Sequence, residues 1–461
     1  MEYVSTRGGS GPVSFADACL SGLAPDGGLY TPVEYPKLAP AKPGESYFDL
    51  ATRILSAFSA GSIAPDVMAG LVEKAYASFA HQSVTPLNQV GPDRWLLELH
   101  HGPTLAFKDV AMQIIAQIYD HLLAERGERL TVLCATSGDT GGAAAAAFAG
   151  LKSVDVFILH PYGRISPIQR RFMTSTGASN VHNLALDGDF DGCQAIVKSL
   201  FGDAGFRDEV NLSGVNSINW TRIAAQSVYF AAAQGALGAD RKLRFVVPTG
   251  NFGDALAAYV AARCGMLNGL ELVSAVNANR TMVDLMETGS LSKRSAIATH
   301  SPAMDIALPS NAERLLFEVM GRDPSKLKNF YDSFTQSGEA ELDDQSKGAL
   351  KCVGVKAVSI DDDVTAREMN RLYDETGTLQ CPHTAVGSAS AREVPTDCVD
   401  VILSTAHAAK FPETVSEVTG KTPPLPERSE SFLARDEEFD RLEADLGKVR
   451  EYIRERVGGA R

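Results

Sequence analysis

The chain has 461 residues, of which 44% are hydrophobic and 22% are charged, so its composition is that of a globular protein with room for two or three domains. Its formal net charge of -14 weakens attraction to nucleic acids and anionic lipid surfaces, and we expect neither as a partner. The sequence shows no apolar run of about eighteen residues and no signal-peptide pattern. Together with scattered cysteines that lack zinc-site spacing, these features predict a cytoplasmic protein without a metal site.

Residues 1–95 differ from the rest of the chain. They are rich in glycine and proline between positions 8 and 44, and a helical pattern follows over 47–79. We interpret this segment as a separate N-terminal α/β domain, followed by a larger region over 96–461.

From residue 130 onward, short β-rich segments alternate with helical ones. The predicted strands cover 130–136, 154–160, 181–186, 243–247, 271–276 and 399–404. Alternating strands and helices indicate parallel sheets. We therefore predict a small wound subdomain over about 125–215 and a large one over 96–124 plus 216–425. Ligands are expected at the carboxyl ends of the strands.

Two charged segments have simple structural interpretations. The segment that follows Pro426 predicts a C-terminal helical extension over 426–461, with its charges on a solvated face. Asp361, Asp362 and Asp363 superficially resemble a metal site, but they precede a helical pattern. Helix capping and the helix dipole therefore explain these aspartates better.

Two loops each lie between a predicted strand and an alanine-rich helix. The first contains Thr136, Ser137, Gly138, Asp139, Thr140 and Gly141, and the second contains Gly250, Asn251, Phe252, Gly253 and Asp254. Backbone N–H groups at such helix starts bind phosphate or carboxylate, although an ordinary capped turn gives the same pattern. Neither loop has the pattern of a P-loop or of a dinucleotide-binding turn, so both of those functions are poorly supported.

Lys108 follows a turn signal and lies near the start of an apolar helix predicted over 110–123. The helix dipole and apolar neighbours would lower its pKa and make it a competent amine nucleophile, whereas an ordinary surface lysine is the alternative. The preceding His100 and His101 would point to opposite faces of an extended segment, so they are better interpreted as structural residues than as metal ligands.

Thr405 directly follows the predicted strand over 399–404, at the end of the sheet where a ligand would lie. Its hydroxyl offers a neutral contact to such a ligand. The alternative is that it caps the next helix.

Five motifs occur in the order and spacing of one enzyme family: H-G-P-T-x-A-F-K-D, T-S-G-D-T-G, N-S-I-N-W-x-R, G-N-F-G-D and S-T-A-H-x-A-K-F. With these motifs the chain resembles the threonine synthases, in their longer bacterial and fungal form. The resemblance covers nearly the whole chain, and S-T-R-G-G near the start also fits the family.

The resemblance implies an α/β fold of the fold-type II pyridoxal 5′-phosphate enzymes, similar to the tryptophan synthase β subunit. Two wound parallel-sheet domains plus an N-terminal domain are expected. Lys108 would hold the cofactor as a Schiff base, Thr405 would face its pyridine nitrogen, and Asp139 would lie near its ring oxygen. The cofactor phosphate would bind the loop formed by Gly250, Asn251, Phe252, Gly253 and Asp254.

For the substrate, the resemblance implies a carboxylate site in the first loop and a phosphate site nearby. The α-carboxylate would bind the loop that contains Thr136, Ser137, Gly138 and Thr140. Asn219 and Arg222, with Thr140, would bind the substrate phosphate.

The family implies a reaction in which O-phospho-L-homoserine and water become L-threonine and phosphate, by γ-elimination and β-addition of water. This is the last step of threonine biosynthesis. The alternatives are a phospho-amino-acid lyase or dehydratase of the same fold type, which would release a keto acid and ammonia, and a non-catalytic phosphometabolite sensor. The N-terminal domain argues against a dehydratase and Lys108 argues against a sensor. We expect a monomer or weak homodimer.

Overall fold

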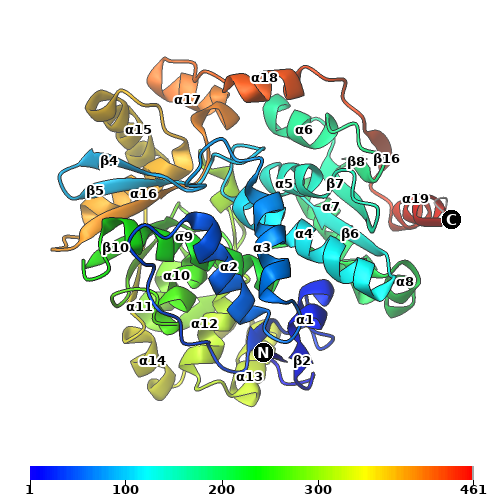
Figure 1. The fold of residues 1–461 in the computed structure, drawn as a ribbon, viewed down its shortest axis with the longest axis horizontal. Coiled ribbons are helices and arrows are strands. Elements are labelled where there is room, and N and C mark those ends of the chain that lie inside the picture. The colour runs from blue at the N-terminus through cyan, green and yellow to red at the C-terminus, as the bar shows by residue number, and fades with distance from the viewer. Residues whose placement is uncertain (459–461) are drawn as a thin grey trace.

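The computed structural model describes residues 1–458 and places them in an N-terminal domain and two subdomains, each built around its own sheet. In Figure 1 the small subdomain, with α5–α8, lies at the right, and the large subdomain lies at the left. The N-terminal domain (dark blue) crosses the lower middle. Within the described residues, no helix is both long enough and apolar enough to cross a membrane.

The N-terminal domain joins a three-stranded antiparallel sheet, in the order β2-β1-β3, to three helices. Its elements are β1 (Glu2–Ser5), β2 (Val13–Ser14), α1 (Phe15–Ser21), β3 (Tyr30–Pro32), α2 (Tyr47–Phe58) and α3 (Pro65–Tyr76). The helices α1 and α2 begin where expected for capped helices, because the side chains of Ser14 and Ser46 accept hydrogen bonds from first-turn N–H groups.

The small subdomain contains a five-stranded parallel sheet in the order β16-β8-β7-β6-β9. Its elements are β6 (Leu130–Ala135), α5 (Asp139–Phe148), β7 (Val154–Pro161), α6 (Pro167–Thr174), β8 (Val181–Asp187), α7 (Phe190–Gly202), α8 (Ala204–Val210), β9 (Leu212–Ser213), β16 (Asp440–Glu443) and α19 (Leu446–Gly458).

The large subdomain contains a six-stranded sheet in the order β14-β11-β10-β15-β5-β4, in which only β4 is antiparallel to its neighbour. The first half of its elements is β4 (Leu87–Gly91), β5 (Arg94–Glu98), α4 (Lys108–Arg126), α9 (Trp220–Leu237), β10 (Leu243–Pro248), α10 (Gly253–Arg263), β11 (Glu271–Val276), α11 (Thr281–Thr288), β12 (Ser290–Ser292) and the short 3-10 helix η1 (Pro302–Met304).

The remaining elements of the large subdomain lead to the last strand of its sheet and to the C-terminal segment. They are α12 (Ala312–Val319), α13 (Pro324–Ser337), β13 (Glu339–Glu341), α14 (Asp344–Lys351), β14 (Val355–Ser359), α15 (Asp362–Thr376), α16 (Pro382–Glu393), β15 (Val399–Ser404), the 3-10 helix η2 (Ala408–Lys410), α17 (Pro412–Thr419) and α18 (Glu427–Leu433).

The structure confirms the predicted alternation of strands and helices and the two parallel sheets, and it adds one detail near the predicted boundary at residue 95 and one in the C-terminal extension. The boundary expected at residue 95 falls inside β5, which pairs with β15 and β4 in the large sheet, so the N-terminal domain ends before β4. The C-terminal extension is not one helix. It contains α18, β16 and α19, and β16 pairs with β8 at one edge of the small sheet.

The central helices α4 and α9 are buried nearly all round and connect the three parts. Trp220, the first residue of α9, is buried against Tyr3 and Phe58, with ring centroids 6.0 and 5.8 Å away. These aromatic contacts bury large apolar surfaces, so they fix the N-terminal domain on the same helix that carries Arg222.

Candidate active site

The turn before Lys108 is held in one conformation by Asp109. The Asp109 carboxylate accepts hydrogen bonds from the Thr104 backbone N–H at 2.8 Å and from the Thr104 hydroxyl at 2.7 Å. A side chain at Gly102 would collide with Asp109, since a Cβ there would lie 2.4 Å from the Asp109 Cβ. Lys108 is thus the first residue of α4, on a rigid turn.

This turn is joined to the end of β15. The Phe107 N–H donates to the Thr405 carbonyl at 2.7 Å, and the His407 N–H donates to the Leu105 carbonyl at 3.0 Å. Both loops of interest also start at carboxyl ends of strands, after β6 and after β10. Lys108, Thr405 and the loop after β10 therefore meet at the carboxyl ends of the strands of the large sheet, where parallel sheets bind ligands.

Asp139, the first residue of α5, faces Lys108 from the small subdomain. Its Oδ2 lies 3.3 Å from the Lys108 Nζ, and its Oδ1 lies 2.7 Å from the Lys410 Nζ. The Gln169 side-chain amide donates to the same Oδ1 at 3.1 Å. The carboxylate consequently joins residues of α4, α6 and η2 across the two subdomains.

Burial and charge act on these groups in opposite directions. Burial lowers the pKa of the Lys108 ammonium, and the Asp139 carboxylate only partly offsets this effect. Burial alone would raise the pKa of Asp139, but the Lys410 and Lys108 ammonium groups hold it well below its usual range. The arrangement keeps a carboxylate ionised beside an amine that loses its proton more easily than a free lysine.

The loop after β10 has the shape of an anion cradle. Phe252 has a φ of 60°, in the left-handed region, and this turn aims the first N–H groups of α10 along one direction. A Cβ on Gly250 would lie 2.7 Å from the Ala303 carbonyl oxygen, so only glycine fits there. Gly253 is packed nearly as closely, against the Asn311 side chain.

Asp254 and Arg222 are a buried pair of ionisable groups beside this loop. Tyr229 donates its hydroxyl to Asp254, and burial raises the pKa of the Asp254 carboxyl to about 7. Burial lowers the pKa of Arg222 to about 10. The Arg222 cation in turn lowers the pKa of Lys108, and both cations act to lower the pKa of Asp254 against the effect of burial. Asp254 and Arg222 therefore form one cluster of interacting ionisable groups with Lys108.

Polar atoms in and around this cluster still lack partners. Among residues 1–458, Arg222 Nε, Asp254 Oδ2 and His383 Nδ1 are buried without a hydrogen-bond partner. Buried polar groups are normally paired, so their presence beside a glycine cradle and a buried lysine fits a polar, phosphate-bearing cofactor such as pyridoxal phosphate.

The loop after β6 is organised by Thr136. Its hydroxyl accepts hydrogen bonds from the N–H groups of Gly138 and Gly141, at 2.9 and 3.0 Å. Gly138 has a φ of 142° and touches Gln169, whereas Ser137 is exposed and Thr140 is half-buried at the start of α5. Ser137 and Thr140 are therefore the side chains of this loop that stay accessible to a small ligand.

Asn219 is occupied by structural contacts. Its side-chain oxygen accepts a hydrogen bond from the Thr221 N–H at 2.9 Å and so caps α9. Its amide donates to the Cys19 carbonyl at 2.9 Å and to the Tyr119 hydroxyl at 3.0 Å. Both ends of the amide therefore already have partners within the protein. The expected contact between Asn219 and a substrate stays a prediction.

Three residues of this site were not anticipated from the sequence: Gln169, His383 and Lys410. Each lies far along the chain from Lys108, and their packing around Asp139 arises only from the fold. One signal was available for Lys410, which follows β15 closely and lies within the S-T-A-H-x-A-K-F motif.

Asp361 and the pair His100 and His101, which superficially resemble metal ligands, have structural partners. Asp361 caps α15 by accepting the Val364 N–H at 2.8 Å, which confirms the capping interpretation. His101 contacts the Glu98 carboxylate at 2.8 Å and stacks on His100. These contacts agree with the structural interpretation of both histidines. The expectation that their side chains point to opposite faces was wrong, because the two rings stack with centroids 5.0 Å apart.

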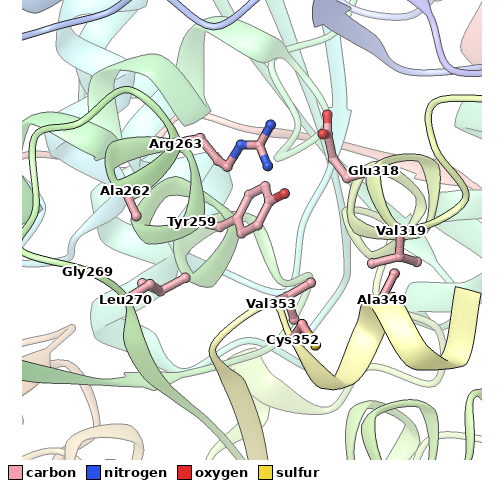
Figure 2. Close-up of a pocket in the computed structure, with 10 residues that line it drawn as sticks. All are labelled: Tyr259, Ala262, Arg263, Gly269, Leu270, Glu318, Val319, Ala349, Cys352 and Val353. Atoms are coloured by element: carbon pink, nitrogen blue, oxygen red, sulfur yellow. The ribbon is translucent and has the colours of Figure 1, made fainter.

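A separate cavity of about 390 Å³ lies at the other end of α10 and contains none of the predicted site residues. Figure 2 shows it between residues of α10, α12 and α14, with Arg263 and Glu318 near the ring of Tyr259. The candidate site is therefore identified by its buried charges and loops, and not by this cavity.

Family models match almost the whole chain. Residues 2–76 match the threonine synthase N terminus, residues 80–404 match the pyridoxal-phosphate dependent enzymes, and residues 384–453 match the threonine synthase C-terminal region. The second of these covers more than half of the chain and contains all of the predicted site residues except Thr405, which directly follows it.

Individual relatives agree with these models. A threonine synthase of Pseudomonas aeruginosa is 42% identical over 466 aligned residues, covering 98% of both chains. The crystal structure of a threonine synthase with bound pyridoxal phosphate from Brucella melitensis matches with a TM-score of 0.95 and 45% identity over 99% of both chains. The yeast threonine synthase structure matches with a TM-score of 0.91 and 34% identity, again over 99% of both chains.

Full-length similarity at this level confirms the predicted fold class and makes pyridoxal 5′-phosphate the cofactor of this chain. Together with the buried lysine, the glycine cradle and the three matching regions, it shows that the chain belongs to the threonine synthase family of pyridoxal-phosphate-dependent lyases.

Proposed function

We propose that this chain converts O-phospho-L-homoserine and water to L-threonine and phosphate, with Lys108 as the residue that binds pyridoxal phosphate covalently. The observation that carries the proposal is the buried Lys108 amine. It lies 3.3 Å from Asp139, at the carboxyl ends of the strands of the large sheet, where the loop after β10 also lies. Pyridoxal phosphate supplies an electron sink that stabilises negative charge at the substrate carbons next to the amine.

The loop formed by Gly250, Asn251, Phe252, Gly253 and Asp254 is the proposed phosphate cradle for the cofactor. Support comes from the left-handed Phe252 and from the close packing of Gly250, which together present the first N–H groups of α10. The Thr405 hydroxyl is the proposed partner of the ring nitrogen, and Asp139 with its lysines is the proposed neighbour of the ring oxygen.

Arg222 is the proposed contact for the substrate phosphate as it leaves. Arg222 is 3% exposed, its Nε lacks a partner among the described residues, and it lies close enough to Lys108 to lower the pKa of that amine. A preorganised buried cation stabilises a departing phosphate where its charge develops. Ser137 and Thr140, with the N–H groups at the start of α5, are the proposed contacts for the α-carboxylate.

The Lys108 amine is the proposed proton carrier once the substrate amine has displaced it. It would take the proton from Cα and then the proton from Cβ, after which phosphate leaves from Cγ, and it would give the two protons back to Cγ and, at the end, to Cα. A general base must titrate near the working pH, and burial lowers the pKa of Lys108. Water is then added at Cβ.

Product analysis tests this proposal against its alternative. The purified chain, incubated with O-phospho-L-homoserine and pyridoxal phosphate, is expected to release L-threonine and phosphate in equal amounts. Release of a keto acid and ammonia would instead identify a phospho-amino-acid lyase of the same fold type.

Arg222→Lys tests the proposed contact with the leaving phosphate. The variant keeps the positive charge but loses the two-pronged donor geometry of the guanidinium, so kcat should fall by about 10²-fold or more.

A further inference from the structure

Asp139 holds two buried lysines, one on each carboxylate oxygen. Lys410 is 1% exposed, with its Nζ 2.7 Å from Oδ1, whereas Lys108 is 12% exposed, with its Nζ 3.3 Å from Oδ2. Gln169 donates to Oδ1 at 3.1 Å and so fixes the orientation of the carboxylate. Lys410 also lies over the face of Phe172, 5.2 Å from the ring centroid, which is a favourable place for a cation.

The two lysines cannot share the carboxylate equally. With both amines protonated, the buried cluster of two lysines and one aspartate carries a net positive charge, and burial disfavours such a charge. The cluster becomes neutral when one amine loses its proton. Lys410 has the shorter contact and the aromatic neighbour, whereas Lys108 has the longer contact and also senses the Arg222 cation.

We propose that Lys410 is a positioning residue that stays protonated, keeps Asp139 ionised and aimed at Lys108, and thereby leaves Lys108 as the lysine whose nitrogen gives and takes a proton. The inference rests on the proposed function of Lys108 and deepens it. In this arrangement Asp139 and Lys410 act as a neutral pair, and a change to either charge shifts the protonation of the Lys108 Nζ.

Other ionisable groups face the cluster from the neighbouring elements and contribute a constant background. They are Asp109 of α4, Arg222 of α9, Asp254 of α10, and Cys381 and His383 at the start of α16. All of them are retained in the variants below, so differences between variants report on positions 139 and 410.

The test is a pH titration of the visible absorbance of the holoenzyme. The absorption band of pyridoxal phosphate moves when the Lys108 nitrogen joined to it loses its proton, so the midpoint reports the pKa of that nitrogen without requiring turnover. Lys410→Met removes the positive charge at nearly constant length. We expect the midpoint to rise by about one to three pH units, because Asp139 then acts on Lys108 alone.

Three further variants separate an electrostatic role from a merely structural one. Lys410→Arg keeps the charge, and its midpoint should stay near that of the wild type. Asp139→Asn should lower the midpoint, because the carboxylate that favours the proton is lost. The double variant Asp139→Asn/Lys410→Met should have a higher midpoint than Asp139→Asn alone, and this comparison remains available if Lys410→Met does not fold.

An unchanged midpoint in Lys410→Met, or equal midpoints in Asp139→Asn and in the double variant, would overturn the role of Lys410. A wild-type chain that never develops the visible band would instead overturn the proposed function, so the two failures are distinguishable.

Discussion

Asp254 is the buried carboxyl of the site whose protonation changes near neutral pH. Its pKa in the folded chain is about 7, above the ordinary value of 3.8, because it is buried. A raised folded pKa gives a contribution to the free energy of unfolding that is fully present below the unfolded pKa and is lost as the pH rises through about 7.

We therefore expect Asp254→Asn to flatten the pH dependence of the free energy of unfolding between the unfolded pKa of 3.8 and the folded pKa of about 7. The measurement is urea unfolding on either side of pH 7, at matched cofactor concentration. Asp363→Asn, at an exposed position of α15, is the matched control and should leave the dependence intact. Identical slopes for the wild type and Asp254→Asn would contradict the assigned pKa.

Gly250 tests the cofactor cradle. Gly250→Ala places a Cβ 2.7 Å from the Ala303 carbonyl oxygen, so the loop must shift at a cost of about 1 to 3 kcal/mol. The expected result is weaker binding of pyridoxal phosphate, measured by absorbance titration. Gly348→Ala in α14 has open space around the new methyl group and should bind the cofactor as the wild type does. Equal affinities for all three proteins would rule out a close-fitting cradle.

The residues predicted from the sequence and those missed differ in a physical way. Lys108, Gly250 and Asp139 lie in short segments whose turn chemistry and neighbours mark them locally. Lys410 and Gln169 matter only because α6 and η2 pack against the start of α5, and contacts between distant segments leave no local pattern. The same reason explains Asn219, whose amide donates to Cys19 and Tyr119, two residues that are distant in the sequence.

At the scale of elements, the buried strands were the easiest to predict and the edge strands the hardest. Strands β6, β7, β10 and β15 are mostly apolar and buried along nearly their whole length, because helices cover both faces of a parallel sheet. By contrast, β16 is polar and largely exposed, and only its pairing with β8 makes it a strand. The predicted helical extension over 426–461 did not include this strand for that reason.

The C-terminal helix α19 belongs to the core of the small subdomain. Ile453 is fully buried in a cluster with residues of β8 and α7. We expect Ile453→Ala to lower the free energy of unfolding by about 2 to 5 kcal/mol, through lost burial and the cavity left behind. Denaturant unfolding checks this, with the exposed Glu451→Ala as control, for which a change within about 0.5 kcal/mol is expected. A small effect for Ile453→Ala would mean that α19 is not packed as described.

At the scale of the whole molecule, the C-terminal segment connects the two subdomains. In Figure 1, α18 runs along the top between α17 and α6. Arg428 donates to the His101 carbonyl near the Lys108 turn, at 2.6 Å, while Phe432 stacks on Phe172 of α6 with ring centroids 5.9 Å apart. Because α6 also supplies Gln169, the segment supports the Asp139 cluster from outside.

The N-terminal domain is connected to the site through Asn219. Asn219→Ala removes the cap of α9 and leaves the Cys19 carbonyl and the Tyr119 hydroxyl without the amide donor that binds both. We expect a loss of about 2 to 4 kcal/mol in the free energy of unfolding, more than for a cap alone. Asp361→Ala, which removes only the cap of α15, should cost about 1 kcal/mol. Equal losses in the two variants would show that Asn219 does not join the domains.

The central claim is that Lys108, and not its buried neighbour Lys410, binds pyridoxal phosphate. The most direct measurement is borohydride reduction of the holoenzyme, followed by proteolysis and mass spectrometry of the peptides. We expect a reduced pyridoxyl group on the peptide that contains Lys108, an unmodified Lys410, and no such group in Lys108→Ala. A pyridoxyl group on Lys410, or a wild-type protein that carries none, would contradict it.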